Sequence, residues 1–204
     1  MSLENPAGSK TQLIVPLLAA LRDLSAWLKA AHTPGAVIGG VAASLLGRPR
    51  LTRDVDAIVI LHEGKWAEFL TAGEQFGFKP RVADALAFAR KARVLLVRHE
   101  PSGIDVDMVF GGLPFEEETV ARAAWTSIGG IHIPLPAPED LIIMKAVAHR
   151  PRDLSDIEAL LDAHPKLDLR RVRRWVREFS SALEMPEIMR DLETAITNRR
   201  KKKK

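Results

Sequence analysis

The sequence predicts an α+β fold, in which a mixed β-sheet with flanking helices over residues 1–136 is followed by a helical region over 137–198. Short runs rich in Val, Ile and Leu, typical of buried strands, alternate with helical periodicities in the first part of the chain. From Pro138 onward the pattern is helical, with short polar and proline-containing breaks. With 204 residues, 47% of them hydrophobic, the chain has ample material for a core.

The expected elements follow from local periodicity and turn signals. Apolar spacing predicts helices over 11–31, 41–46, 65–76 and 116–124. Apolar and β-branched runs predict strands over 36–38, 54–61, 92–99, 104–110 and 126–135, the last interrupted by Gly129-Gly130. The segment Glu100-Pro101-Ser102-Gly103 suits the turn of a hairpin. Breaks at Arg150-Pro151, His164-Pro165 and Met185-Pro186 divide the C-terminal region into four helices.

Charge is unevenly distributed along the chain. The sequence has a net charge of +4 and a pI near 9.6, but six of its 30 basic residues lie in 199–204. Subtracting those six from 30 leaves 24 basic residues against 26 acidic ones, a balance of −2. We therefore expect residues 199–204 to form a disordered basic tail on a nearly neutral body.

Several classes of protein are disfavoured by composition. The absence of cysteine removes disulfides and thiolate metal sites. The N-terminus has no signal pattern, and no run approaches the roughly 18 apolar residues of a membrane span. We expect a soluble, cytoplasmic protein without a membrane partner.

Two pairs of carboxylates mark predicted strands. Asp54 and Asp56 begin the strand DVDAIVIL, and the two-residue period of a strand sends both to one face, about 7 Å apart. Asp105 and Asp107 repeat this spacing in GIDVDMVF. Acids on adjacent strands can hold two divalent metals roughly 4 Å apart, one activating a hydroxyl and one clamping a triphosphate. A single Asp-x-Asp also fits a solvated strand end.

A glycine turn precedes the first pair. Gly39 and Gly40 lie between a predicted strand and a predicted helix, where backbone N–H groups can approach a phosphate. A plain tight turn explains the two glycines equally well. In the loop before Asp54, Arg48 and Arg53 are candidate triphosphate contacts.

Together these residues resemble a known family. The order Val37-Ile38-Gly39-Gly40, thirteen residues, then Asp54-Val55-Asp56-Ala57 is similar to the signature of the nucleotidyltransferase superfamily, which has a polymerase-beta-like fold. The segments TRDVD and LIIMKAVAHRPRDLSDIEAL resemble its AbiEii/AbiGii toxin-type branch.

The resemblance implies transfer of a nucleotidyl group from an NTP such as ATP, with Mg²⁺ or Mn²⁺ bound by Asp54, Asp56 and a third acid. Asp107 matches the hydrophobic-Asp-hydrophobic element of the family best, and Asp105 is the alternate. The branch pattern also places a Lys and an Asp beside the active site, which here are Lys145 and Asp153. The implied setting is a toxin–antitoxin or phage-defence system, with tRNA, other RNA or protein as acceptor and a cognate toxin or antitoxin as partner.

Lys145 has a second explanation, because its helix is apolar nearly all round. We expect it to have an anionic partner, which could equally be an internal carboxylate. Asp153 could simply cap the following helix. In the predicted helix DLRRVRRWVREF, Arg170, Arg173, Arg174 and Arg177 share one face, which suits either an RNA backbone or plain solvation.

Three alternatives remain open on sequence grounds. A small-molecule nucleotidyltransferase of the antibiotic-modifying type would use the same donor site. A non-catalytic protein of the same fold would bind a nucleotide or a partner. A basic RNA-binding protein would depend on the arginines of residues 170–177 and not on Asp56.

Overall fold

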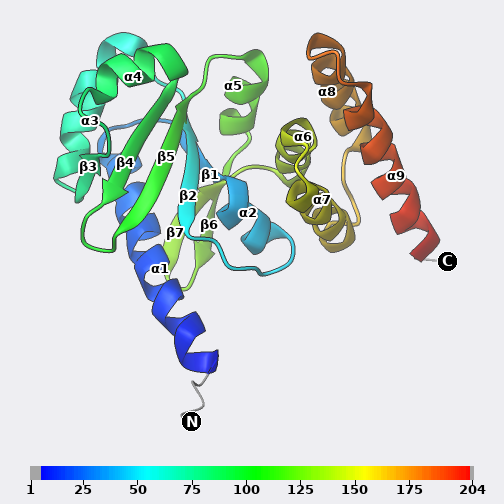
Figure 1. Ribbon diagram of the computed structural model, residues 1–204, viewed down its shortest axis with the longest axis horizontal. Helices are drawn as coiled ribbons and strands as arrows, with labels where there is room; N and C mark the ends of the chain where they lie inside the picture. Colours follow the sequence, from blue (N-terminus) through cyan, green and yellow to red (C-terminus); the bar gives the residue numbers. More distant parts are fainter. Residues whose placement is uncertain (1–5, 203–204) are drawn as a thin grey trace. The chain divides into compact units, whose positions relative to one another are not determined.

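The computed structural model describes residues 6–202 of the chain (Figure 1). The chain divides into two compact units. The sheet unit comprises residues 1–37 and 52–135, and the helical unit comprises residues 38–51 and 136–204. The boundary expected after residue 136 lies next to this division, but residues 38–51 join the C-terminal helices and not the sheet.

The sheet unit is built on a five-stranded mixed sheet. Its strands are β1 (Gly35–Ile38), β2 (Asp54–Val59), β3 (Phe78–Pro80), β4 (Val94–His99) and β5 (Ile104–Phe110). The strand order is β1-β2-β5-β4-β3, with β2 parallel to β5, and with β4 antiparallel to both β5 and β3. A separate two-stranded sheet pairs β6 (Ala124–Ile128) with β7 (Ile131–Leu135).

Aromatic side chains attach two helices to one face of the main sheet. The helical segments of this unit are α1 (Pro6–Ala30), the 3-10 turn η1 (Glu63–Lys65), α3 (Trp66–Glu74), α4 (Ala85–Ala92) and α5 (Pro114–Ala121). Trp27 of α1 stacks on Phe69 of α3 at 4.3 Å between ring centroids and on Phe78 of β3 at 5.1 Å. Trp66 of α3 stacks on Phe110 of β5 at 4.0 Å. Side chains at alternate strand positions share a face, so α1 and α3 cover the face that carries Phe78 and Phe110.

The helical unit contains α2 and the four C-terminal helices. They are α2 (Gly39–Leu46), α6 (Pro138–Ala148), α7 (Pro151–Ala163), α8 (Leu169–Ala182) and α9 (Pro186–Lys202). Pro138, Pro151 and Pro186 each occupy the first helical position, where the missing N–H costs no hydrogen bond. Within the unit, α6 packs against α7 and α8, α9 packs against α7 and α8, and α2 contacts α6 and α7.

Most expected elements are confirmed, and the differences have local causes. The segment 126–135 forms two strands and not one, because Gly129 and Gly130 both have positive φ, 58° and 81°, and close a tight hairpin. Strand β3 was not expected, since its three residues, which end in Pro80, show no periodicity. Helix α4 was not expected either. Helix α9 continues to Lys202, so most of the expected tail is helical, and residues 203–204 lie outside the described part of the chain. Within that described part, no helix is long and apolar enough to cross a membrane.

Candidate active site

Four carboxylates form two rows across the sheet unit. The register pairs Asp54 with Asp105, and Asp56 with Asp107, on the parallel strands β2 and β5. Register partners point to the same face, as do residues two apart on one strand. All four acids therefore lie on the face opposite α1 and α3, with partners about 5 Å apart between strands. One strand's acids thus lie beside the other's, as the sequence led us to expect.

Basic residues that sequence patterns did not single out extend both rows. In the antiparallel pair β4–β5, Arg98 lies opposite Asp105 and Leu96 lies opposite Asp107. Arg81 follows β3 and continues its ladder by donating its backbone N–H to the Leu96 carbonyl oxygen at 3.0 Å. Arg81 thus shares a row with Asp107, separated from it by β4, and its long side chain crosses that strand.

Both arginines bond to the acids of β5. Arg81 donates from Nη1 to Oδ2 of Asp105 at 3.3 Å and from Nη2 to Oδ1 of Asp107. Arg98 donates from Nε to Oδ1 of Asp105 at 2.7 Å. On β2, the hydroxyl of Thr52 donates to Oδ1 of Asp54 at 3.0 Å.

The two acids of β5 differ in electrostatic environment. The hydrogen bond from Arg98 lowers the pKa of Asp105 below its ordinary value of 3.8. Burial, the largest influence, raises the pKa of Asp107 above 3.8. The charge of Arg81 opposes this rise in the pKa of Asp107, and the charges of Asp54 and Asp105 add to it. Asp105 is therefore held ionised, and Asp107 is the better proton acceptor of the two.

The donor chemistry of this face fits a hard divalent cation, which prefers carboxylate oxygens. A cation would also relieve the crowding of negative charge around Asp107. In the part of the chain that the structure describes, however, no three His, Cys, Asp or Glu side chains gather closely enough to hold a metal ion. Arg81 supplies the positive charge at Asp107 instead. Joint metal binding by Asp54, Asp56 and Asp107 would therefore require Arg81 to move away from Asp107.

The glycine turn belongs to the helical unit. Gly39 begins α2 with φ of 64°, a left-handed conformation that glycine adopts at little cost. Its N-terminal neighbour Ile38 has no side-chain group that caps the first N–H groups of α2. The first turn of α2, which includes Gly40, therefore lacks the side-chain cap that many helices have. Such N–H groups suit an anion.

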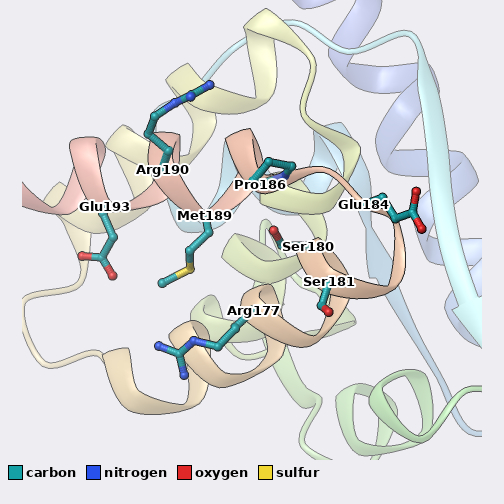
Figure 2. A pocket seen from close by; sticks show the side chains of 8 residues that line it. All are labelled: Arg177, Ser180, Ser181, Glu184, Pro186, Met189, Arg190 and Glu193. Atoms are coloured by element: carbon teal, nitrogen blue, oxygen red, sulfur yellow. The ribbon is translucent and has the colours of Figure 1, made fainter.

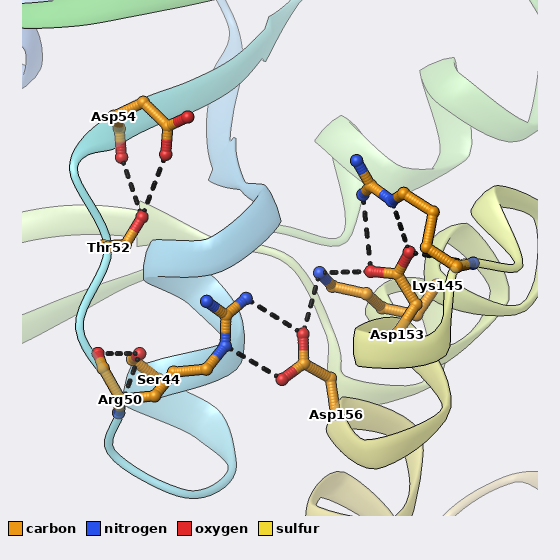
Figure 3. Close-up of polar contacts among 8 residues, drawn as sticks. Ser44, Arg50, Thr52, Asp54, Lys145, Asp153 and Asp156 are labelled. Atoms are coloured by element: carbon orange, nitrogen blue, oxygen red, sulfur yellow. Dashed lines mark hydrogen bonds and ion pairs between the residues drawn. The ribbon is translucent and has the colours of Figure 1, made fainter.

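Lys145 lies in a buried ion-pair cluster of the helical unit (Figure 3). Only 3% of the residue is exposed, and its Nζ lies 2.9 Å from Oδ1 of Asp153 and 2.9 Å from Oδ2 of Asp156. Lys145 thus has two anionic partners where one was expected, and both lie on α7. Asp153 also accepts the backbone N–H of Arg150 at 3.3 Å and the Arg150 side chain at 2.6 Å, so it stabilises the start of that helix.

Burial acts against the charge of Asp153, but hydrogen bonds from Arg150 and Lys145 outweigh it and lower the pKa of Asp153. Asp156 receives two further hydrogen bonds from Arg50, both at 3.0 Å. These contacts attach the loop after α2 to α7. Of the two loop arginines proposed from sequence, Arg48 is exposed in the helical unit and Arg53 is exposed in the sheet unit.

The arginine-rich face of α8 is partly neutralised. Val172 and Val176 are buried, as the amphipathic pattern predicts. Arg173 donates to Glu193 of α9 at 2.6 Å and 3.0 Å, which raises the pKa of Arg173. Arg170 and Arg177 remain exposed.

A shallow groove of about 560 Å³ lies between α8 and α9 (Figure 2). Its lining includes Arg177, Met189 and Glu193. A smaller hollow of about 280 Å³ in the sheet unit is lined by Trp125, Lys29 and residues around Pro34. No residue proposed for catalysis or nucleotide binding lines either space, so neither one identifies the active site.

Several solved structures share the fold of this protein. The solution structure of the antibiotic-resistance factor ANT(2'')-Ia matches with a TM-score of 0.56 and 15% identity, covering 84% of this chain and 95% of that one. The crystal structure of ANT(2'')-Ia in complex with adenylyl-2''-tobramycin matches with a TM-score of 0.55 and 16% identity, covering 82% and 99%. An antigenic nucleotidyltransferase-like protein from Paracoccidioides brasiliensis matches with a TM-score of 0.50 and 17% identity, covering 89% and 91%. At these identities the similarity shows the nucleotidyltransferase fold.

The sequence itself gives the family. Residues 18–194 match the model of the family described as nucleotidyl transferase of unknown function, DUF2204. The chain belongs to this family, and it is therefore an enzyme of the nucleotidyltransferase class. A search of curated proteins found no significant match. The resemblance to nucleotidyltransferases is thus confirmed, whereas the AbiEii/AbiGii branch remains a prediction.

Proposed function

We propose that this chain transfers a nucleotidyl group from an NTP to an acceptor hydroxyl in a reaction that depends on Mg²⁺ or Mn²⁺. The observation that carries the proposal is the register of β2 and β5, which sets Asp54, Asp56, Asp105 and Asp107 side by side on one face. We propose Asp54, Asp56 and Asp107 as the residues that would hold the divalent ion. When bound, the ion would neutralise triphosphate charge and assist departure of pyrophosphate.

Asp107 has a second proposed role as proton acceptor. In the metal-free protein, burial raises the pKa of Asp107, whereas the hydrogen bond from Arg98 lowers the pKa of Asp105, so Asp107 is the more basic of the two in that state. As the acceptor oxygen forms its bond to the α-phosphorus, the hydroxyl proton passes to the Asp107 carboxylate. The bond from the α-phosphorus to the bridging oxygen breaks, and pyrophosphate leaves with that electron pair. Asp105 keeps its charge throughout and serves to hold Arg98 in place.

The proposed nucleotide contacts are Gly39, Gly40, Arg48 and Arg53. The uncapped first turn of α2 supports a role for the two glycines in phosphate binding. The exposure of the two arginines allows an ionic contact. For Lys145 we propose a structural role, because its Nζ is buried between two carboxylates.

A small hydroxyl compound is the acceptor that we favour. The complex of ANT(2'')-Ia with adenylyl-2''-tobramycin supports this class, and the match covers 99% of that protein. RNA or protein in a toxin–antitoxin system is the second candidate. The exposed Arg170 and Arg177 support it, but the pairing of Arg173 with Glu193 reduces the charge available to a nucleic-acid backbone.

Labelled transfer distinguishes these acceptors. The protein is incubated with Mg²⁺, each α-labelled NTP in turn, and either total RNA or a panel of aminoglycosides and other polyhydroxyl compounds. We expect label in the small-molecule fraction, and we expect it to disappear with EDTA or with Asp56→Asn. Label in RNA would identify the toxin-type acceptor instead. Label that persists in Asp56→Asn would contradict the assignment of Asp56 as a metal ligand.

A further inference from the structure

We propose that Arg81 is an internal cation that competes with the divalent metal for Asp107, so that metal binding displaces its guanidinium. This inference rests on the proposed function. Arg81 approaches from the edge of the sheet, next to β3, and its side chain crosses β4 to reach both acids of β5. Its side chain is 27% exposed and that of Asp107 is 43% exposed, so ions from solvent can reach the pair.

The two acids of β5 differ in their arginine partners, and this difference favours release of Arg81 from Asp107. Asp105 has two arginine partners, Arg81 and Arg98. Among the residues that the structure describes, Arg81 is the one basic partner of Asp107. If Arg81 moves away, Asp105 remains neutralised by Arg98 at 2.7 Å, and Asp107 becomes available as a ligand. The exchange therefore leaves neither acid without a cation once the metal has bound.

Charge balance explains why a cation is required at this place. The four carboxylates of the two rows carry a formal charge of −4, and the guanidiniums of Arg81 and Arg98 each offset one unit of it. Departure of Arg81 removes one positive charge and a divalent ion adds two, so the exchange makes the rows less negative by one unit. The like charges repel each other across strands about 5 Å apart. A metal ion thus neutralises the rows more completely than Arg81 does, at the cost of one ion pair.

Direct measurement of Mn²⁺ binding tests the competition without reference to activity. Free Mn²⁺ is quantified by electron paramagnetic resonance in titrations of the wild-type protein, Arg81→Gln and the matched control Arg98→Gln. Both variants lose one guanidinium from the same face, but only Arg81→Gln removes the partner of Asp107. We expect the Kd for Mn²⁺ to fall at least about 5-fold in Arg81→Gln, and to fall clearly less in Arg98→Gln.

Folding is checked by circular dichroism and thermal melting, and Arg81→Lys provides a second variant that retains the charge. A single ammonium cannot span Asp105 and Asp107 as the guanidinium does, so we expect Arg81→Lys to have an intermediate Kd. Equal tightening in Arg81→Gln and Arg98→Gln would show an effect of net charge alone and would overturn the inference. Unchanged or weaker binding in Arg81→Gln would overturn it as well.

Failure of the inference and failure of the proposed function give different results. Equal Kd values in all proteins, together with Mn²⁺-dependent nucleotidyl transfer, would reject competition by Arg81 and leave the proposed function intact. Absence of Mn²⁺ binding from all proteins would reject the proposed metal dependence, and with it any competition for the metal.

Discussion

Asp56 of β2 and Asp107 of β5 are register partners on adjacent parallel strands, so the two carboxylates leave the same face of the sheet unit side by side. This relationship connects two motifs that are about fifty residues apart in the sequence. It supports the proposal of a shared metal and leads to specific predictions about activity, stability and pH dependence.

Removing the charge of Asp56 tests the shared site most directly. We expect Asp56→Asn to lower kcat/KM about 100-fold or more, because it removes a proposed ligand of the ion that would stabilise developing charge, while the shape of the side chain is retained. Steady-state nucleotidyl transfer is measured for this variant and for Asp162→Asn, a change at an exposed carboxylate of α7. An equal loss in Asp162→Asn would mean that the assay does not report on the acid rows.

The two acids of β5 should affect stability with opposite dependence on pH. The pKa of Asp105 is lowered in the folded state, so its ionised form contributes stability above its unfolded pKa, and this contribution is lost as the pH falls through the folded value. The pKa of Asp107 is raised, so its contribution is present below its unfolded pKa and is lost as the pH rises through the folded value.

Urea unfolding in EDTA between about pH 3 and pH 7 measures both effects. We expect the free energy of unfolding of Asp105→Asn to decrease relative to that of the wild type as the pH rises, because only the wild type gains stability from ionised Asp105. The free energy of unfolding of Asp107→Asn should increase relative to that of the wild type over the same range. Parallel pH profiles for the two variants would contradict the assigned environments.

Substitutions at the two glycines that begin α2 distinguish a requirement of backbone conformation from a role in phosphate binding. Gly39 has φ of 64°, so Gly39→Ala should cost about 1–2 kcal/mol of stability, the usual penalty for an L-residue in this region. Gly40 lacks a positive φ, so Gly40→Ala carries no such penalty. We expect both variants to bind ATP more weakly, as measured by calorimetry. Unchanged ATP affinity in Gly40→Ala would argue for a plain structural turn.

Lys145 should be important for stability. Lys145→Met leaves Asp153 and Asp156 without their shared ammonium in a buried site, and we expect a loss of about 3–5 kcal/mol in urea unfolding. Lys65→Met is the matched control, because Lys65 pairs with Glu68 at the surface, where both side chains are more than half exposed. The control should cost clearly less, because solvent screens an exposed ion pair. A loss in Lys145→Met no larger than in the control would contradict a structural role.

Local pattern predicted much of this protein. The two-residue period of a strand was enough to place Asp54 with Asp56, and Asp105 with Asp107, on common faces. Proline-containing breaks at Arg150-Pro151, His164-Pro165 and Met185-Pro186 predicted the division of the C-terminal region into four helices, as observed. The unusual position of Lys145 in an apolar helix indicated an anionic partner, which the structure supplies on the next helix.

Tertiary structure alone decided the neighbours of these residues. The sequence left Asp105 and Asp107 as alternates, because strand order and register come from pairing between distant segments and not from local periodicity. Arg81 follows a three-residue strand that has no recognisable pattern, and it meets Asp107 only because β3, β4 and β5 are adjacent in the sheet. The sequence by itself therefore determined which acids share a face, whereas long-range strand pairing decided which acids lie together and which cation lies against them.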